Sequence, residues 1–372
     1  MAVIIKEVKT KSDIKQFVEL PFDIYKNNSF WVPPIRSDEK KALDKSKNPA
    51  FEFCNAKFFL AFENKKCVGR IGAIINKSYN KKVGVKYGRI NKIEFYDNHE
   101  ISEQLINTAT EWFKEQGMEY IHGPLGFTNL DTQGMLIEGF DFLQSVASVY
   151  HQPYYKEHFE KLGFEKENDW VEFRLTLTDV ALQKGKRGSE IVKKRFGFSI
   201  LNFTSLKELK PYNTQIFHIL NDAFKTLPYV TELNDKMIDL YVKKYFSILN
   251  PKYIKVAKKG DETVGFFVGL PSLSEAMQKA NGSLFPFGFL HVLKALKKPK
   301  VIDMLLTGVL QEHQSAGVAV ILISELQEQM LKDGINQMET TGVFETNHNV
   351  IANWKNYEHI LHKRRRCFVK KI

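Results

Sequence analysis

The sequence predicts a mixed α/β fold made of two halves with the same plan, and three observations support this prediction. Residues 60–69 and 256–265 share one pattern, in which an apolar run ending in Ala leads through a polar turn to Val-Gly and a second apolar run. Each pattern is typical of a β-hairpin. The matching alanines and the matching glycines of the two runs are also equally far apart in the chain. The third observation is a helical pattern that ends at glycine in each half.

Apolar side chains recur every three to four residues in 101–116 and again in 319–330. This period is that of a helix with one buried face. Gly117 and Gly334 follow these runs, and glycine commonly ends a helix because it adopts the left-handed conformation needed there. A strand-like run comes directly after each glycine. The order hairpin, strand, helix, strand therefore occurs twice, which predicts two α/β domains with mixed sheets.

The length of 372 residues is too great for one ordinary core, so two domains are expected. We place an N-terminal domain at residues 1–183, a basic, glycine-containing junction at 184–198 and a C-terminal domain at 199–372. Ordinary repetition of α/β units is the alternative to a duplicated domain.

The composition indicates a soluble globular protein, with 43% hydrophobic and 26% charged residues. No apolar run is long enough to span a membrane, and the first residues lack the apolar core of a signal peptide. The three cysteines, Cys54, Cys67 and Cys367, are too few for a disulfide framework and lack zinc-ligand spacing. We therefore expect a cytoplasmic protein with reduced thiols.

The chain is basic, with a formal net charge of +11 and a pI near 9.2. This charge suits anionic partners such as phosphorylated cofactors, nucleic acid or an anionic membrane surface. Basic residues cluster at 184–195, 294–300 and 363–366, although such runs are also common on solvated faces. No nucleic-acid-binding motif is recognisable, so nucleic acid is not an expected partner.

Residues 314–319 read Gln-Ser-Ala-Gly-Val-Ala between an apolar, strand-like run at 302–310 and a helix-like run at 318–332. The first N–H groups of a helix have no partner within the helix and attract anions. Gly317 would let phosphates approach the backbone, because a Cβ atom there would block them. Ala319 would keep the next turn slim. This segment therefore predicts a pyrophosphate-binding site.

The spacing and context of this segment resemble the pyrophosphate loop of the GCN5-related N-acetyltransferase (GNAT) superfamily, whose pattern is Gln/Arg-x-x-Gly-x-Gly/Ala. The resemblance implies tandem GNAT domains and acetyl-CoA or a longer acyl-CoA as co-substrate, without a metal. A backbone N–H near Val309 or Leu310, where the strands splay, would stabilise the developing oxyanion. The implied cofactor-binding residues are Val309, Leu310, Gln314, Ser315, Ala316, Gly317, Val318, Ala319 and Asn347.

The same resemblance implies catalytic roles for residues that follow the last strand of the C-terminal half. GNAT enzymes place an Asn beside CoA, and Asn347 fits this position better than Asn349. They place a Tyr on the following helix to protonate the leaving thiolate, and Tyr357 occurs one residue later than the usual spacing. Helix capping by Asn347 and simple packing by Tyr357 are the alternatives. Glu345 is the favoured general base.

Glu312 and His291 are further candidates for the general base, and each could equally be a surface residue. In the N-terminal half, the matching helix places Asp97 and Glu100 where Gln314 and Gly317 stand. Carboxylates there would repel phosphates, so we expect only the C-terminal half to bind the cofactor.

Two further segments of the N-terminal half are informative. Residues 154–164 resemble the Tyr-x-Lys-x-Gly-Phe ending of GNAT domains, or form a plain amphipathic helix closed by glycine. Residues 123–141 are rich in glycine yet carry bulky apolar side chains. They predict a long ordered loop that either recognises the acceptor or packs between the halves.

Residues 282–300 begin with aromatic side chains and end with lysines. Such a segment can lie at a membrane interface, line an apolar pocket or pack between domains. This segment, residues 314–319, residues 345–347 and the basic ending at 363–370 resemble a bacterial group of GNAT-like proteins that includes bacterial ceramide synthases. The resemblance implies a lipid-like amine as acceptor, or another small-molecule amine.

The sequence thus predicts an acyl-CoA-dependent N-acyltransferase in which a primary amine attacks the thioester directly. We expect a cytoplasmic location, with peripheral contact at the inner membrane surface as an option. A non-catalytic CoA-binding sensor and an aminoacyl-tRNA-dependent transferase are the alternatives. The sequence specifies no oligomeric state.

Overall fold

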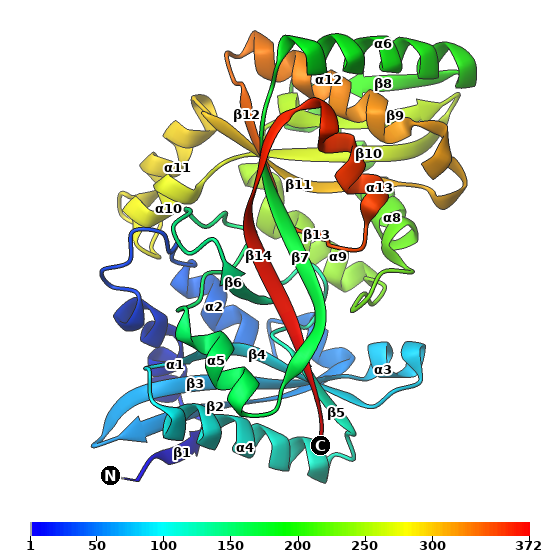
Figure 1. The fold of residues 1–372 in the computed structure, drawn as a ribbon. Helices are drawn as coiled ribbons and strands as arrows, with labels where there is room; N and C mark the ends of the chain where they lie inside the picture. Colours follow the sequence, from blue (N-terminus) through cyan, green and yellow to red (C-terminus); the bar gives the residue numbers. More distant parts are fainter. Residues whose placement is uncertain (1) are drawn as a thin grey trace. The chain divides into compact units, whose positions relative to one another are not determined.

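The computed structural model describes residues 2–372, and these residues form two compact units. Unit 1 contains residues 2–171, Ser274–His291 and His362–Ile372. Unit 2 contains Glu172–Leu273 and Val292–Leu361. Each unit is a mixed sheet with helices packed on it, as the ribbon in Figure 1 shows.

The sheet of unit 1 is antiparallel through its first four strands, and β4 and β5 then run parallel. Its strand order is β1 (Ile4–Glu7), β2 (Cys54–Glu63), β3 (Lys66–Asn76), β4 (Tyr87–Phe95), β5 (Tyr120–Gly123), β14 (Glu358–Lys371) and β7 (Glu165–Thr176), with β6 (Met135–Glu138) paired to β14. Its helices are α1 (Lys11–Ile24), α2 (Arg36–Leu43), η1 (Pro49–Glu52), α3 (Lys77–Val83), α4 (His99–Glu115), α5 (Tyr154–Lys161) and α10 (Ser274–Ala280).

The sheet of unit 2 follows the same plan, because its strands are antiparallel except for the parallel pair β11 and β12. Its strand order is β7, β12 (Gln337–Thr340), β11 (Val301–Val309), β10 (Glu262–Pro271), β9 (Ile254–Lys259) and β8 (Phe198–Asn202), with β13 (Val343–Phe344) paired to β7. Its longer helices are α6 (Asp179–Phe196), α8 (Asn213–Phe224), α9 (Asp235–Tyr245) and α12 (Val318–Lys332).

Short helices complete unit 2, and one helix, α11, is divided between the units. The short helices are α7 (Leu206–Leu209), η2 (Lys210–Tyr212), η3 (Phe246–Ile248), η4 (Pro251–Tyr253), η5 (Gln311–Ala316), α13 (His348–Ile351) and η6 (Ala352–Asn356). The boundary between the units falls inside α11 (Gly288–Lys297). Figure 1 shows α6 and α12 along one face of the unit 2 sheet and α8 and α9 along the other. Residues 264–271 of β10 are accordingly buried on both faces.

The predicted fold class is confirmed, and several predicted elements occur where the sequence places them. Both hairpins are present, as β2 with β3 and as β9 with β10. The helix predicted at 318–332 is α12, with the same bounds. The helix predicted at 101–116 is α4, which begins two residues earlier because Asn98 caps it.

The predicted junction at 184–198 is mostly helix rather than linker. It belongs to α6, which begins at the side-chain cap Thr178 and packs against α12 inside unit 2. A Cβ atom added at Gly185 would lie 3.3 Å from Gln327, and one added at Gly188 would lie 3.3 Å from Val320. The glycines that suggested a linker therefore let two helices approach closely.

The units also differ from the predicted domains of 1–183 and 199–372 at three places. Residues 172–183 fall in unit 2, whereas Ser274–His291 and His362–Ile372 fall in unit 1. The last strand, β14, pairs there with β5 over Phe368↔Gly123 to Lys371↔Tyr120. Strand pairing joins residues that are far apart in the chain, so no local pattern in the sequence indicates this membership.

Candidate functional site

Strands β11 and β12 separate partway along β11, so that, among the described residues, the last part of β11 pairs with β10 alone. The two strands pair only from Val301↔Gln337 to Met304↔Thr340, whereas β11 continues to Val309. The hydroxyl of Thr341 donates to the carbonyl oxygens of Met304 and Leu305, at 3.0 and 3.3 Å. This side chain closes the paired end. An open backbone edge therefore extends from Leu306 to Val309.

Strand β11 also carries an irregularity where this open edge begins. Val268 pairs with Leu306, but the next residue, Gly269, pairs with Met304. Leu305 is thus an extra residue on β11, which is the arrangement of a β-bulge. A bulge bends and twists its strand, so it assists the separation from β12.

The backbone groups that point toward the open edge follow from a single hydrogen bond. The N–H of Leu310 donates to the carbonyl oxygen of Val264 at 2.9 Å. Since antiparallel pairs alternate between bonded and non-bonded, Gly265↔Val309 is a non-bonded pair, and the N–H of Val309 points away from β10. Two residues earlier, Thr307 presents its N–H and C=O to the same side. The N–H of Val309 therefore faces the opening. The N–H of Leu310 is bonded to β10, so the expectation that Leu310 could donate to the oxyanion is wrong.

The segment between β11 and α12 forms a short helix, η5, rather than an open loop. The backbone N–H of Gln311 donates to the Asp222 carboxylate on α8 at 2.9 Å. The side-chain amide of Gln314 donates to the carbonyl oxygen of Val309 at 3.2 Å. Gly317 caps α12 without a side-chain hydrogen bond. The first N–H groups of α12, at Val318 and Ala319, thus lack a side-chain cap and can receive an anion.

The reason for glycine at position 317 differs from the expected one. Gly317 has φ +79°, a conformation that L-residues rarely adopt. A Cβ atom added there would lie 2.8 Å from Cγ2 of Val192 on α6. The backbone conformation and the neighbouring helix therefore already require glycine at this position, and close approach by a phosphate stays a prediction.

Helix α12 runs back along β11, which sets the position of Tyr357. At the start of α12, Val318 lies beside Gly265, and further along Leu326 lies beside Gly269, the residue that pairs with Met304. The next residue, Gln327, donates a hydrogen bond to the Tyr357 hydroxyl. This contact places the phenol beside α12, one residue after Leu326, which lies at the level of Met304. Burial raises the pKa of Tyr357 above 10.0.

The other residues assigned from the sequence have different positions. The Asn347 side chain accepts a hydrogen bond from the N–H of Val350 at 3.3 Å and caps α13, which is the alternative role given above. Glu345 is half-buried directly after β13, the strand paired to β7, and so does not lie on β11. Glu312 and His291 are exposed.

Sequence reasoning missed two buried carboxylates at the base of the opening. Asp303 on β11 and Glu339 on β12 are direct partners in the parallel pair, with 0% and 7% of their surface exposed. Arg174 donates to Glu339 at 2.7 Å. The neighbour of Asp303, Ile302, faces α12, so Asp303 projects from the opposite face of the sheet. An acidic residue within an apolar strand was the signal in the sequence.

The equivalent opening in unit 1 is filled by the chain itself. Strands β4 and β5 pair from Tyr87↔Tyr120 to Arg89↔His122 only. The N–H of Leu125 then donates to the carbonyl oxygen of Ile90 at 2.8 Å. The side-chain amide of Asn91 donates to the carbonyl oxygen of Leu125 at 3.0 Å. Leu125 and Phe127 are buried. The first part of the segment 123–141 thus packs inside unit 1 and fills this opening. Acceptor recognition by the rest of the segment stays a prediction.

The helix terminus of unit 1 is also closed. The Asn98 side chain accepts the N–H of Glu100 at 3.0 Å and caps α4. Asp97 contacts the ring of His158 at 3.0 Å. An anion at this terminus would meet a side-chain cap and two carboxylates, so unit 2 offers the better site for phosphates.

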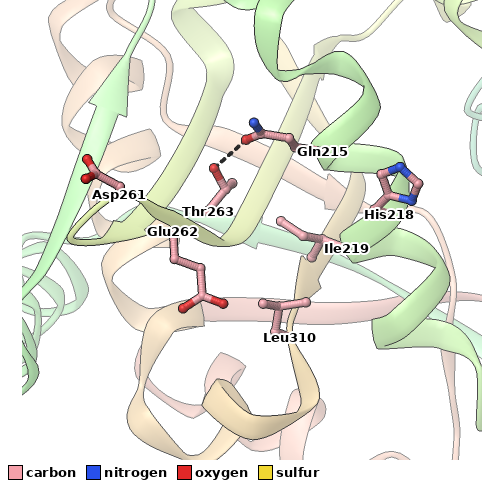
Figure 2. A pocket seen from close by; sticks show the side chains of 7 residues that line it. All are labelled: Gln215, His218, Ile219, Asp261, Glu262, Thr263 and Leu310. Carbon is pink, nitrogen blue, oxygen red and sulfur yellow. Dashed lines mark hydrogen bonds between the residues drawn. The ribbon is translucent and has the colours of Figure 1, made fainter.

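A pocket of about 370 Å³ lies near Leu310 on the α8 side of the sheet. Figure 2 shows the Thr263 hydroxyl bonded to Gln215, at 2.6 Å, with the Glu262 carboxylate directed away from that pair. Asp261 and Glu262 line this pocket, so it does not suit phosphates. Glu262, Glu312 and His313 also place one ligand atom each within 4.8 Å of one another, but both carboxylates are exposed and we assign no ion there.

Known proteins share this architecture and parts of this sequence. No family model matches the chain. Its sequence is 28% identical to Protein YghO of Escherichia coli, over 92% of this chain and 89% of that protein. It is 25% identical to a bacterial ceramide synthase of Caulobacter vibrioides, over 91% and 90%.

The fold matches that of a tandem GNAT protein from the clavulanic acid biosynthesis pathway, with a TM-score of 0.56 and 11% identity over 99% of this chain and 98% of that one. The chain thus has the tandem GNAT fold, as predicted. In the part of the chain that the structure describes, no helix is both long and apolar enough to cross a membrane.

Proposed function

We propose that this protein is an acyl-CoA-dependent N-acyltransferase whose donor site lies in unit 2. One observation carries the proposal: the open edge of β11 leads through the short helix η5 to the uncapped N-terminus of α12. The first supplies backbone groups for an extended chain, and the second supplies N–H groups for a pyrophosphate. Unit 1 has neither feature, because its own residues occupy both positions.

The pantetheine arm of CoA contains two amide groups and can pair with the open edge as an additional strand would. Thr307 presents its N–H and C=O for this pairing, and Val309 presents its N–H, because the Val309 carbonyl already accepts from Gln314. With the pyrophosphate at Val318 and Ala319, the arm extends along β11 toward the bulge at Leu305. The thioester then lies near the point at which the strands separate. We place Tyr357, which α12 holds through Gln327, beside it.

The reaction is direct attack of the amine on the thioester carbonyl carbon. A C–N bond forms, the carbonyl oxygen becomes an oxyanion, and the amine loses a proton. Collapse of this intermediate breaks the C–S bond and gives an amide and a thiolate. We assign protonation of the thiolate to Tyr357, whose raised pKa keeps its proton at neutral pH.

The carboxylates of Asp303 and Glu339 replace Glu345 as our candidates for the group that receives the amine proton, directly or through water. They project from the sheet face opposite α12, whereas Tyr357 lies at the α12 face. A donor and an acceptor of protons would therefore flank the thioester from opposite faces. This arrangement suits a reaction in which the amine enters on one side and the thiol leaves on the other.

The acceptor we propose is a long-chain, lipid-like amine. The support is the similarity over nearly the whole chain to a protein named bacterial ceramide synthase. The co-substrate would then be a long-chain acyl-CoA, with acetyl-CoA as the short-chain alternative.

Calorimetry with acetyl-CoA and palmitoyl-CoA tests the donor site. Ser315 is exposed just before the α12 N-terminus, so Ser315→Asp adds a negative charge without filling a buried space. We expect this variant to bind CoA esters roughly tenfold more weakly, through repulsion of the phosphates. The control Asn107→Asp adds the same charge on the exposed face of α4 and should bind like the wild type.

Gly317→Glu is a poor test, since a side chain there would collide with Val192. Equal affinity of Ser315→Asp and Asn107→Asp would contradict the site. Binding without turnover of any amine would favour a non-catalytic CoA-binding protein. Absence of CoA binding, together with salt-dependent RNA binding, would favour an aminoacyl-tRNA-dependent transferase.

A further inference from the structure

The segment 284–300 holds four large apolar side chains in solvent. Phe285 is 78% exposed, Phe287 70%, Leu290 51% and Leu293 47%. Among the described residues, no other stretch of similar length exposes as many large hydrophobic side chains. Single exposed hydrophobic residues are ordinary, but a contiguous group commonly marks an interaction surface.

Hydrogen bonds fix the loop that carries the two phenylalanines. The N–H of Arg36 donates to the carbonyl of Gly282 at 3.0 Å, which ties the start of the loop to α2 within unit 1. The Ser283 hydroxyl donates to the carbonyl of Phe285 at 2.7 Å, and the N–H of Phe289 donates to Leu284 at 2.8 Å. The phenyl rings thus project from an ordered loop.

Helix α11 continues the same exposed surface and changes its chemistry along its length. Val292 is buried, with 8% of its surface exposed, and marks the packed face. Leu290 and Leu293 lie on the exposed side in the first turns, followed by Lys294 and Lys297 in the last turn. Lys298 and Lys300 follow the helix and are exposed. Apolar side chains therefore lead into a basic end.

We propose that the segment 284–300 docks the protein on an anionic lipid bilayer. Phe285, Phe287 and Leu290 would enter the boundary between headgroups and acyl chains, while the lysines contact lipid phosphates. The alternative occupant, a second copy of this chain, would bring two lysine groups of like charge together. Charge complementarity therefore favours an anionic membrane. This inference concerns a surface distinct from the donor site and does not depend on the proposed reaction.

Vesicle sedimentation tests the docking surface with the full-length protein. We expect binding to vesicles of phosphatidylcholine and phosphatidylglycerol mixed in equal amounts, and much weaker binding to pure phosphatidylcholine. The double variant Phe285→Ser, Phe287→Ser should lose at least roughly tenfold in partitioning, because two inserted rings are removed. Since both side chains are exposed, the variant should fold and bind CoA like the wild type.

The triple variant Lys294→Gln, Lys297→Gln, Lys298→Gln should lose on the order of a hundredfold on anionic vesicles, given about fivefold for each lysine near the surface. A matched control, Ile4→Ser with Leu331→Ser, removes two exposed apolar side chains elsewhere and should sediment like the wild type.

Three results would overturn the proposal. The wild type could fail to bind anionic vesicles, or the phenylalanine variant could bind as the wild type does. In the third, the wild type self-associates without binding vesicles, and the phenylalanine substitutions make it monomeric, so that the surface is an interface between copies.

Discussion

The side-chain amide of Gln327 donates a hydrogen bond to the hydroxyl of Tyr357, which holds the phenol beside α12. This contact gives Tyr357 a fixed position although its spacing from Asn349 is unusual for a GNAT enzyme. A tyrosine that protonates a thiolate must lie beside the thioester, which is the position that we propose for Tyr357.

Replacement of Tyr357 by Phe tests its assignment as proton donor. We expect kcat for amine acylation to fall by roughly 10²- to 10³-fold, in the range of general acid catalysis. The Kd for acyl-CoA should stay close to the wild-type value, because the hydroxyl does not contact the phosphates. Gln327 loses its acceptor, so stability should fall by about 1 kcal/mol. Reduced stability with an unchanged kcat would show that Tyr357 only packs.

Gly317→Ala should destabilise unit 2 through two separate effects. The positive φ angle costs an L-residue about 1–2 kcal/mol, and the new Cβ atom collides with Val192. Combining it with Val192→Ala removes the collision but keeps the backbone strain. Denaturant unfolding of the two single variants and the double variant separates the effects, since the double variant should lose less than the sum. If the losses of stability simply add, the collision with Val192 does not contribute to the destabilisation by Gly317→Ala.

Asn98→Ala should lower the stability of the protein without changing its affinity for the co-substrate. The Asn98 side chain caps α4 through the N–H of Glu100, and loss of such a cap costs about 1 kcal/mol. Thermal unfolding measures this loss, and calorimetry should give an unchanged Kd for acyl-CoA. A weakened Kd would indicate that the terminus of α4 in unit 1 also binds the cofactor.

His151 makes unit 1 sensitive to acid. Burial, with smaller contributions from Arg365 and Arg70, lowers the pKa of His151 from 6.5 to about 3. The unfolded chain therefore binds more protons between these two values, so stability is complete above pH 6.5 and falls as the pH drops toward 3. The ring Nδ1 accepts the N–H of Leu136 at 3.2 Å.

His151→Asn provides an amide oxygen to accept the same N–H but no titrating group. The variant should lose less stability on acidification, by about 1 kcal/mol per pH unit between about pH 4 and 6. Urea unfolding at several pH values gives this slope directly. The same slope in both proteins would show that His151 does not control the acid response.

Much of the fold could be predicted because its signals are local. The bounds of α12 follow from an apolar period of 3.6 residues, with Gly317 before the helix and Gly334 just after it. The two hairpins follow from short turns between apolar runs. The loss of the phosphate site in the N-terminal half could also be proposed from Asp97 and Glu100 alone, and the capped terminus of α4 agrees with it.

The site was only partly predictable, since the residues around it are distant in the chain. The sequence located the segment from Gln314 to Ala319 but assigned Gly317 to the phosphates, because nothing near it indicates Val192. It assigned Asn347 to the cofactor, although the same residue type is equally typical of a helix cap. Residues 184–198 were interpreted as a junction between two domains, since glycine serves both domain boundaries and close helix packing.

The sequence by itself determined the fold class, the duplicated plan, both hairpins and the positions of α4 and α12, because side-chain periodicity, turns and caps act over a few residues. Only the tertiary structure decided that Val309 rather than Leu310 faces the open edge, and that Asp303 lies beside Glu339. The physical reason is strand register, in which one extra residue at Leu305 reverses the direction of every later backbone group. Register arises from pairing between distant strands.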